Sequence, residues 1–264
     1  MAKRRKALFT KGEANAKTKK GEKLDFLTLI LHLAPADSSG REVCSYRSPG
    51  CTLDCLNLTG RGGILTADET TNAVQLRRIA RTDEYFADPA AFIERLAREI
   101  TNAEKVAAAE GLQLVVRCNG TSDLPTIALQ LAERFPHLTF YDYTKLPRPW
   151  LRQRANYHLT FSRSELNDAH VFEVLSRGGN VAVTFDTKKG EALPVSYFGV
   201  PVLDGDDHDL RFLDPTRAGG YVIGLRYKLP FKRRGEKRRA PSAFVVRVAS
   251  LPATDRSSTV REAA

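Results

Sequence analysis

The sequence predicts an α/β protein built around a parallel sheet, in the form of a full or partial β/α barrel. Short apolar, β-branched runs recur roughly every 20–25 residues along the middle of the chain. Several gaps between these runs carry apolar residues at helical spacing. The 264 residues are 42% hydrophobic and 27% charged, which is enough to bury a substantial core in one large domain.

The predicted strands are short, apolar and flanked by turn residues. Their alternation with helices implies crossover connections and a sheet covered on both faces. About seven strands favour a barrel, full or partial, over an open doubly wound sheet. The expected strands lie at residues 26–35, 112–118, 138–143, 157–161, 180–185, 200–203 and 221–226, with a further candidate at 243–248.

Three of the gaps between strands predict helices, because their apolar residues fall on one helix face. Asp88 followed by Pro89 is a helix cap with a first-turn proline, and Ser164 is a weaker cap with Asn167 three residues on. The apolar stripes are Phe92, Leu96 and Ile100; Ile127, Leu131 and Phe135; and Val171, Val174 and Leu175. The helices are followed by residues typical of a helix end, namely Gly111, Pro136, and Gly178 with Gly179.

The formal net charge of +10 is concentrated outside the predicted core. Residues 1–23 carry nine Lys or Arg against two Glu, and residues 226–239 carry eight against one, which is a net +7 in each segment. We therefore expect one domain over residues 24–228, with a disordered basic tail before it. Residues 229–264 should form a basic segment, the candidate last strand and a disordered polar tail, since residues 249–264 are rich in Ser, Thr, Pro and Ala.

Basic segments of this kind suit contact with nucleic acid, because each neutralised phosphate releases a counterion. Solubility and flexible ends are the plain alternative. The candidate nucleic-acid-binding residues are Lys3, Arg4, Arg5, Lys6, Lys232, Arg233, Arg234, Lys237, Arg238 and Arg239.

No segment of the sequence predicts a membrane span or a signal peptide. The longest apolar run, at residues 26–35, is about half the ~20 residues that cross a bilayer. The basic start MAKRRK is not followed by the apolar stretch that a signal peptide requires. We expect a cytoplasmic protein.

Three of the four cysteines lie within twelve residues, directly after the first predicted strand: Cys44, Cys51 and Cys55, in the pattern C-x6-C-x3-C. In a cytoplasmic protein such a cluster indicates thiolate–metal ligation more than disulfides. Three thiolates hold a [4Fe–4S] cluster and leave one iron open, whereas a fourth from Cys118 would close the cluster or complete a zinc site. Ordinary buried thiols are the remaining alternative.

The position of the cysteines predicts where their sulfur atoms lie. Pro49 and Gly50 allow the chain to reverse, so the three loop sulfurs should converge near the mouth of the barrel. Cys118 directly precedes Asn119, and successive side chains of a strand point to opposite faces. We therefore expect Cys118 to point into the core, which would leave the metal site open.

Polar clusters follow several of the predicted strands. In parallel α/β folds the carboxyl ends of the strands meet at one edge, so these side chains should surround one substrate or cofactor site. Turn formation and helix capping are the plainer explanation for each single residue. The candidates are Asn119, Thr121, Ser122, Asp123, Asp142, Lys145, Ser162, Arg163 and Asp186.

The densest acidic stretch is DGDDHD at residues 204–209, with Asp214 beyond it. Carboxylates of this kind suit magnesium, but the spacing is not that of an EF-hand loop. A solvated turn that forms ion pairs with Arg211 or Arg217 is the favoured interpretation.

Several stretches together resemble one known protein family: GCTLDCLNLTGRGG, VQLRRIARTDEYFADPAAFIERL, VVRCNGTSDLP, FYDYTK, NYHLTFSRSE, GGNVAVTF and DGDDHDLRFLDP. In this order they look like the gene product 88 domain family of phage and mobile-element proteins. The resemblance covers most of residues 24–228. It implies one folding unit, and a place in the host cell's cytoplasm if a phage encodes the chain, but no reaction. The layout is loosely similar to radical S-adenosylmethionine barrels, although the cysteine spacing departs from their C-x3-C-x2-C pattern.

Two functions fit these observations. One is an enzyme in which an iron–sulfur cluster at the mouth of a β/α barrel, with S-adenosylmethionine bound near Asn119, acts on a nucleic acid or nucleotide. The alternative is a nucleic-acid-binding mobile-element protein with a structural zinc or cluster site. In a third interpretation the basic ends bind a partner protein and the cysteines are inert.

Overall fold

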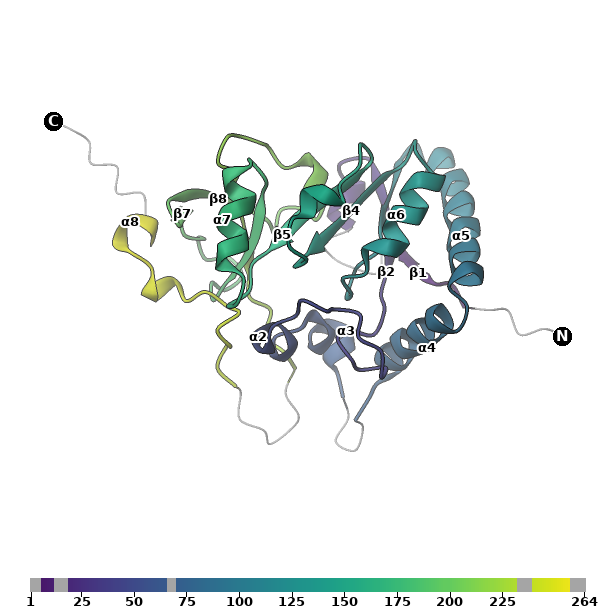
Figure 1. Ribbon diagram of the computed structural model, residues 1–264, viewed down its shortest axis with the longest axis horizontal. Coiled ribbons are helices and arrows are strands. Elements are labelled where there is room, and N and C mark those ends of the chain that lie inside the picture. The colour runs from purple at the N-terminus through teal and green to yellow at the C-terminus, as the bar shows by residue number, and fades with distance from the viewer. Residues whose placement is uncertain (1–5, 12–18, 66–69, 232–238, 257–264) are drawn as a thin grey trace.

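The computed structural model describes residues 6–11, 19–65, 70–231 and 239–256. They form a mixed α/β fold around a nine-stranded sheet, in the order β1-β2-β3-β4-β5-β6-β9-β8-β7 (Figure 1). All neighbouring pairs from β2 to β8 are parallel. The strands are β1 (Phe9–Lys11), β2 (Phe26–Leu31), β3 (Gln113–Arg117), β4 (Thr139–Thr144), β5 (Tyr157–Ser162), β6 (Val181–Phe185), β7 (Ser196–Tyr197), β8 (Val200–Asp204) and β9 (Val222–Arg226).

The seven strands expected from the apolar runs are all present, as β2 to β6, β8 and β9. Neighbours in the sheet follow the order of the chain from β2 to β6, and only β9 and β8 exchange places. The further candidate at residues 243–248 is not a strand. It forms a single parallel bridge, between Phe185 and Val246.

Two short antiparallel strands, neither of them predicted, stand at the ends of the sheet. β1 pairs with β2, and β7 pairs with β8. The expectation of a disordered tail is therefore wrong for Phe9–Lys11. Leu8 and Phe9 are 1% and 6% exposed and pack into the core, and the Glu99 carboxylate accepts hydrogen bonds from both of their backbone N–H groups.

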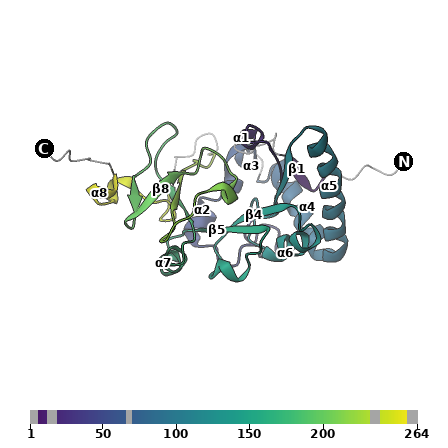
Figure 2. The ribbon, with the colours of Figure 1, turned by 90° about the horizontal axis from the view of Figure 1, so that it is seen from above.

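The strand order has two ends, and no pairing within the described residues joins β1 to β7. The prediction of an α/β fold with a largely parallel sheet is confirmed, whereas the closed form of the predicted barrel is not formed by these pairings. Seen from above, α6 and α7 lie along one side of the sheet and α1 lies on the other (Figure 2).

The helices are α1 (Lys19–Glu22), α2 (Pro49–Leu53), α3 (Gly60–Gly63), α4 (Ala73–Ala87), α5 (Pro89–Ala109), α6 (Pro125–Arg134), α7 (Asp168–Ser176) and α8 (Ala253–Arg256), with 3-10 turns η2 (Leu56–Leu58), η3 (Pro149–Leu151), η4 (Arg211–Leu213) and η5 (Val248–Ser250). Within the part of the chain that the structure describes, none of the helices combines the length and hydropathy of a membrane span.

The three predicted helices are α5, α6 and α7, and their apolar stripes face the core. Asp88 caps α5 as expected, since its carboxylate accepts a hydrogen bond from the N–H of Ala91. The cap predicted at Ser164 is wrong. Asn167 occupies the N-cap of α7, and its side chain accepts a hydrogen bond from the N–H of Ser164 at 2.7 Å, which tightens the turn before the helix.

The two faces of the sheet bury different residues. Leu29, Val116 and Phe140 belong to the apolar core that also holds the inner faces of α5 and α6. On the opposite face Tyr141 packs with η4, where its ring lies 5.5 Å from that of Phe212. Side chains two positions further along each strand stay on this second face. Tyr143, near the carboxyl end of β4, therefore lies on the same face as Tyr141.

Candidate functional site

A cavity of about 240 Å³ opens at the carboxyl ends of the parallel strands, on the second face of the sheet. The chain between β2 and α4 covers it, and in Figure 1 this segment, with α2 and α3, lies along the lower edge of the sheet. The cavity wall includes Arg117 of β3, Tyr143 of β4, Ser162 of β5 and Thr184 of β6, together with Cys44, Cys51 and Cys55.

The cysteine loop is held by the short helix α2. Ser48 caps this helix, since its Oγ accepts a hydrogen bond from the N–H of Cys51 at 3.0 Å. Glu165, from the loop after β5, accepts hydrogen bonds from the Ser48 hydroxyl and the Gly50 N–H, both at 2.7 Å. A Cβ atom at Gly50 would lie 2.6 Å from the Glu165 carboxylate and would push it away from this contact. Pro49 and Gly50 thus form the first turn of α2.

Asp54 ties the same loop to the C-terminal segment. Its side chain is fully buried, and it accepts hydrogen bonds from the Tyr227 hydroxyl at 2.7 Å and the Ser242 hydroxyl at 2.5 Å. Arg239 adds an ion pair at 2.5 Å. Burial alone would raise the pKa of Asp54, but these hydrogen bonds outweigh burial and lower the pKa.

Burial determines the protonation of the loop thiols. It raises the pKa of Cys44 to about 12, although the N–H of Ala36 donates to Cys44 Sγ at 3.4 Å. Burial also raises the pKa of Cys55, against a hydrogen bond from the Asn57 N–H to Cys55 Sγ at 3.5 Å and the positive charge of Arg78. Both thiols are protonated at neutral pH, and a bound cation would favour their thiolate forms.

Cys118 lies apart from the loop cysteines. It is fully buried in the apolar core, and burial raises the pKa of its thiol well above the ordinary value. Asn119 lines the cavity and Cys118 does not, as strand alternation predicts. Among the described residues no three His, Cys, Asp or Glu side chains are arranged to hold one metal ion. The loop cysteines thus share one cavity without forming the tight trio expected from the sequence.

Six of the nine predicted strand-end residues line the cavity: Asn119, Thr121, Ser122, Asp123, Lys145 and Ser162. Several of them also build their own loops. The Asn119 side chain accepts hydrogen bonds from the Ser122 hydroxyl at 2.9 Å and the Leu124 N–H at 2.8 Å. The Thr121 hydroxyl donates to the Leu33 carbonyl at 2.6 Å. The turn interpretation of this segment is therefore correct, and the segment faces the cavity as well.

Asp123 and Lys145 supply charge to this wall. Burial raises the pKa of Asp123, although its carboxylate accepts a hydrogen bond from the Lys145 N–H at 2.7 Å. The Lys145 ammonium donates to Ser162 Oγ at 3.0 Å and lies 5.2 Å from the centre of the Phe244 ring. An ammonium group in this setting suits a negatively charged ligand group.

Asp142 lies behind the residues that line the cavity and does not line it itself. Its predicted place beside a ligand is therefore wrong. Its carboxylate is 1% exposed and accepts hydrogen bonds from Asn119 N–H at 2.7 Å, Asn119 Nδ2 at 2.9 Å and the Tyr157 hydroxyl at 3.0 Å. Burial raises the pKa of Asp142 to about 7, against these hydrogen bonds. Asp142 supports the turn at Asn119 from below.

Comparison with known proteins gives one match. Residues 5–247 match the model of a protein family described as gene product 88. The chain belongs to the gene product 88 family. The match spans the sheet from β1 to β9 together with the cysteine loop, so the resemblance drawn from the sequence motifs is confirmed. No curated protein and no solved structure matches the chain.

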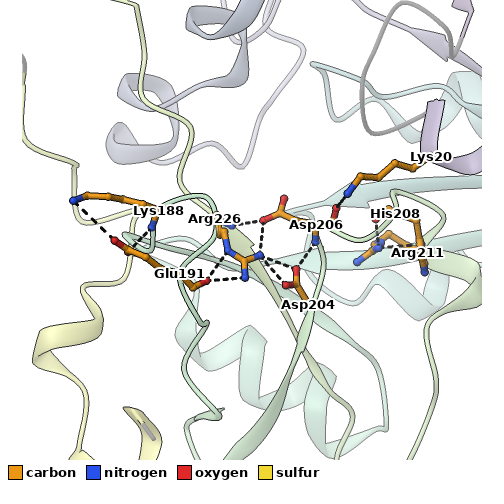
Figure 3. Close-up of polar contacts among 8 residues, drawn as sticks. All are labelled: Lys20, Lys188, Glu191, Asp204, Asp206, His208, Arg211 and Arg226. Atoms are coloured by element: carbon orange, nitrogen blue, oxygen red, sulfur yellow. Dashed lines mark hydrogen bonds and ion pairs between the residues drawn. The ribbon is translucent and has the colours of Figure 1, made fainter.

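In this gene product 88 chain the acidic stretch after β8 is used in ion pairs (Figure 3). Arg226 lies 2.8 Å from the Asp204 carboxylate and 3.4 Å from that of Asp206. The expected pairing with Arg211 is present at Asp214, at 3.4 Å. Ion pairs are present as expected, but the partner of Asp204 and Asp206 is Arg226, and Arg217 forms no ion pair among the described residues. The expected solvated turn is wrong for Asp209, which is 5% exposed.

Two predicted ligand-binding residues serve the fold of the gene product 88 chain instead. Arg163 forms an ion pair with Asp168 at 3.0 Å, and its guanidinium donates to backbone carbonyls of the C-terminal segment. Asp186 Oδ1 accepts a hydrogen bond from the Val248 N–H at 2.9 Å. Neither residue lines the cavity, and both form hydrogen bonds with the C-terminal segment.

The predicted nucleic-acid-binding residues are only partly described. Arg239 is occupied by its ion pair with Asp54. Lys6 is exposed, beside α5, where its carbonyl accepts a hydrogen bond from Arg95. The remaining candidates lie outside the described residues: Lys3, Arg4, Arg5, Lys232, Arg233, Arg234, Lys237 and Arg238.

The candidate sites predicted from the sequence do not include the buried pair of Arg117 and Asp209. The two side chains are 11% and 7% exposed, their charged groups lie 2.6 Å apart, and the Arg117 guanidinium stands 4.8 Å from the centre of the Tyr143 ring. Burial alone would lower the pKa of Arg117, but Asp209 raises it. A pairing across 92 positions leaves no local pattern in the sequence.

Proposed function

We propose that the chain binds an iron–sulfur cluster through Cys44, Cys51 and Cys55 and acts as an enzyme on a ligand held in the adjoining cavity. One observation carries the proposal: the loop cysteines and the strand-end polar groups line the same cavity. Sites of parallel α/β enzymes lie at this edge of the sheet. On this proposal the linear sheet acts as a partial barrel, with the cavity on its inner face.

The side chains present are of the type that ligates such a cluster, although in the described residues they are not arranged around one metal ion. Thiolates ligate iron–sulfur clusters, and N–H groups directed at the sulfur atoms tune them. Backbone N–H groups already donate to the sulfurs of Cys44 and Cys55. Arg78 and Lys145 act on Cys55 through their positive charge, which favours an anionic cluster at this wall.

The burial of Cys118 favours three thiolate ligands over four. A cubane cluster held by three cysteines keeps one iron open to a small molecule. When bound, it would supply that coordination position and an electron. The polar side chains at the strand ends, which line the same cavity, would then determine which molecule reaches the open iron.

The proposed ligand of the open position is S-adenosylmethionine, and the proposed substrate is a nucleic acid or nucleotide. Lys145 and Ser162 would donate hydrogen bonds to a carboxylate or phosphate. The Asp123 carboxylate, which lines the same wall, would accept them from an amino group. These roles use groups that the fold already holds in place.

Anaerobic reconstitution with ferrous iron and sulfide tests the cluster. The expected product holds about four irons and four sulfides per chain, with visible absorption that dithionite bleaches. Alanine at Cys44, Cys51 or Cys55 should each abolish most of the iron. Cys118→Ala is the matched control, and it should keep a full complement because its thiol lies in the core.

A different metal would favour the alternative function. Colourless protein with about one zinc per chain, lost in the same three loop variants, would support a nucleic-acid-binding mobile-element protein with a structural zinc site. Iron retained after all three loop substitutions would contradict both assignments.

A further inference from the structure

A second concave surface, here called the arginine groove, lies between α4, α5 and the segment that leads into β1. Its charges are strongly unbalanced, because five cations line it against two carboxylates. The cations are Lys6, Arg77, Arg81, Arg95 and Arg98, and the carboxylates are Glu84 and Asp88.

The arginines form two rows. Arg77 and Arg81 are four residues apart on α4, and Arg95 and Arg98 are three apart on α5, so each pair lies on one side of its helix. Burial lowers the pKa of Arg81, the charge of Glu99 raises it, and the charges of Arg77 and Arg95 lower it further. Like charges at this spacing oppose folding, and an anion bound in the groove would relieve the repulsion.

Some of these side chains already contact other groups of the protein, and others form no ion pair in the described residues. Arg95 forms an ion pair with Glu84 at 2.5 Å, and Arg81 donates to two backbone carbonyls. Arg77 and Arg98 are exposed, and neither forms an ion pair with another residue in the described parts of the chain. The walls of the groove are thus fixed, while two guanidinium groups remain available to a ligand.

We propose that the arginine groove binds the phosphate backbone of a nucleic acid. A guanidinium group can donate two parallel hydrogen bonds to the oxygens of one phosphate. Several such groups along one groove bind nucleic acid without preference for its base sequence. Helix α4 connects this groove to the cysteine cavity, since the neighbouring Arg78 donates to Asn57 in the cavity-side loop. The proposal goes beyond the cluster, because the groove is a separate surface and would bind with or without metal in the cavity.

Fluorescence anisotropy of the full chain with a labelled DNA duplex tests the groove. The groove variant is Arg77→Glu with Arg98→Glu. The control is Lys105→Glu with Lys189→Glu, which makes the same change in net charge at two exposed positions outside the groove. At about 0.1 M salt the groove variant should bind at least ~10-fold more weakly, and the slope of log K against log salt should fall by about 2. The control should keep the wild-type slope.

Three outcomes would overturn the proposal. One is wild-type protein that does not bind the duplex, another is equal weakening in both double variants, and the third is binding to anionic phospholipid vesicles that exceeds binding to the duplex. Arg77→Gln with Arg98→Gln repeats the test with a smaller charge change if the first variant fails to fold. A variant with alanine at Cys44, Cys51 and Cys55 should still bind DNA, which separates failure of the groove from failure of the cluster.

Discussion

Replacing Asp54 with asparagine should loosen the cysteine loop from the C-terminal segment. The buried carboxylate accepts hydrogen bonds from the Tyr227 hydroxyl, the Arg239 guanidinium, and both the N–H and the hydroxyl of Ser242. Asparagine keeps the size and one acceptor oxygen. It replaces the second oxygen with an NH2 group that faces donors, and it removes the negative charge.

The magnitude follows from the number of contacts. A hydrogen bond to a charged group contributes ~1.5–3 kcal/mol, and Asp54→Asn weakens several while leaving one acceptor in place. We expect a loss of ~2–4 kcal/mol in the free energy of unfolding. For a domain of this size that lowers Tm by about 5–10 °C.

The assay is thermal and urea denaturation of Asp54→Asn beside Asp37→Asn. Asp37 also pairs with an arginine, Arg47 at 3.1 Å, but its side chain is 68% exposed, so its loss should cost less than about 1 kcal/mol. Alkylation of Cys51 and Cys55 should also be faster in Asp54→Asn, because the loop is held less tightly. Equal stability of the two variants would refute the role assigned to Asp54.

The pH dependence gives a second check. Hydrogen bonds lower the pKa of Asp54 although burial opposes this. The ionised carboxylate therefore stabilises the fold fully at pH values above 3.8, the ordinary pKa of the group. That stabilisation is lost as the pH falls through the folded-state pKa. The gap between wild type and Asp54→Asn should be full at neutral pH and shrink below about pH 4. A gap that persists in acid would show that lost packing, rather than lost charge, causes the effect.

Two further predictions concern the core. Burial raises the pKa of Asp142 to about 7, so wild type should lose ~2–4 kcal/mol of stability relative to Asp142→Asn as the pH rises from about 4 to 7. Urea denaturation across this range measures the change, and a constant difference would contradict it. Gly220→Ala should cost more than about 3 kcal/mol, because φ is +62° and the new Cβ would meet the Gly179 carbonyl at 2.2 Å. Gly111→Ala, at φ +68° in open space, should cost only about 1 kcal/mol, and equal costs would show that the close contact is relieved.

Local patterns in the sequence were enough to predict seven of the nine strands in the sheet. The apolar runs of β2 to β6 are long enough to be recognised singly, and the cap at Asp88 defines the start of α5. β1 has three residues, and its burial depends on the distant Glu99. β7 has two residues and turns into β8 at Phe198, whose φ of +54° no bulky side chain favours.

The strand order needed information from far along the chain, and helix α4 was missed for a different reason. Nothing local says that β9 inserts between β6 and β8, since that arrangement is decided by packing. α4 has a single buried residue, Thr82, so no large buried apolar side chain marks the face that it turns to the core. Its start is nevertheless marked by the capping box of Asn72 and Gln75, a local signal that could have found the helix.

The candidate site was predictable where it depends on chain order. Parallel strands bring Asn119, Lys145 and Ser162 to one edge, and alternation turns Cys118 into the core. The sequence could not separate residues that line the cavity from residues that support it. Asp142 and Arg163 carry the same functional groups as the lining residues, and only their partners show the difference.

Electron paramagnetic resonance of the reconstituted, reduced protein tests the central proposal most directly. If Cys44, Cys51 and Cys55 hold a [4Fe–4S] cluster with one open iron beside the strand-end wall, the spectrum should show a reduced cluster, and S-adenosylmethionine should change it. The Cys118→Ala variant should give the same two spectra. A protein without a cluster signal would contradict the cysteine assignment, and a spectrum unchanged by S-adenosylmethionine would contradict an open iron that faces this ligand.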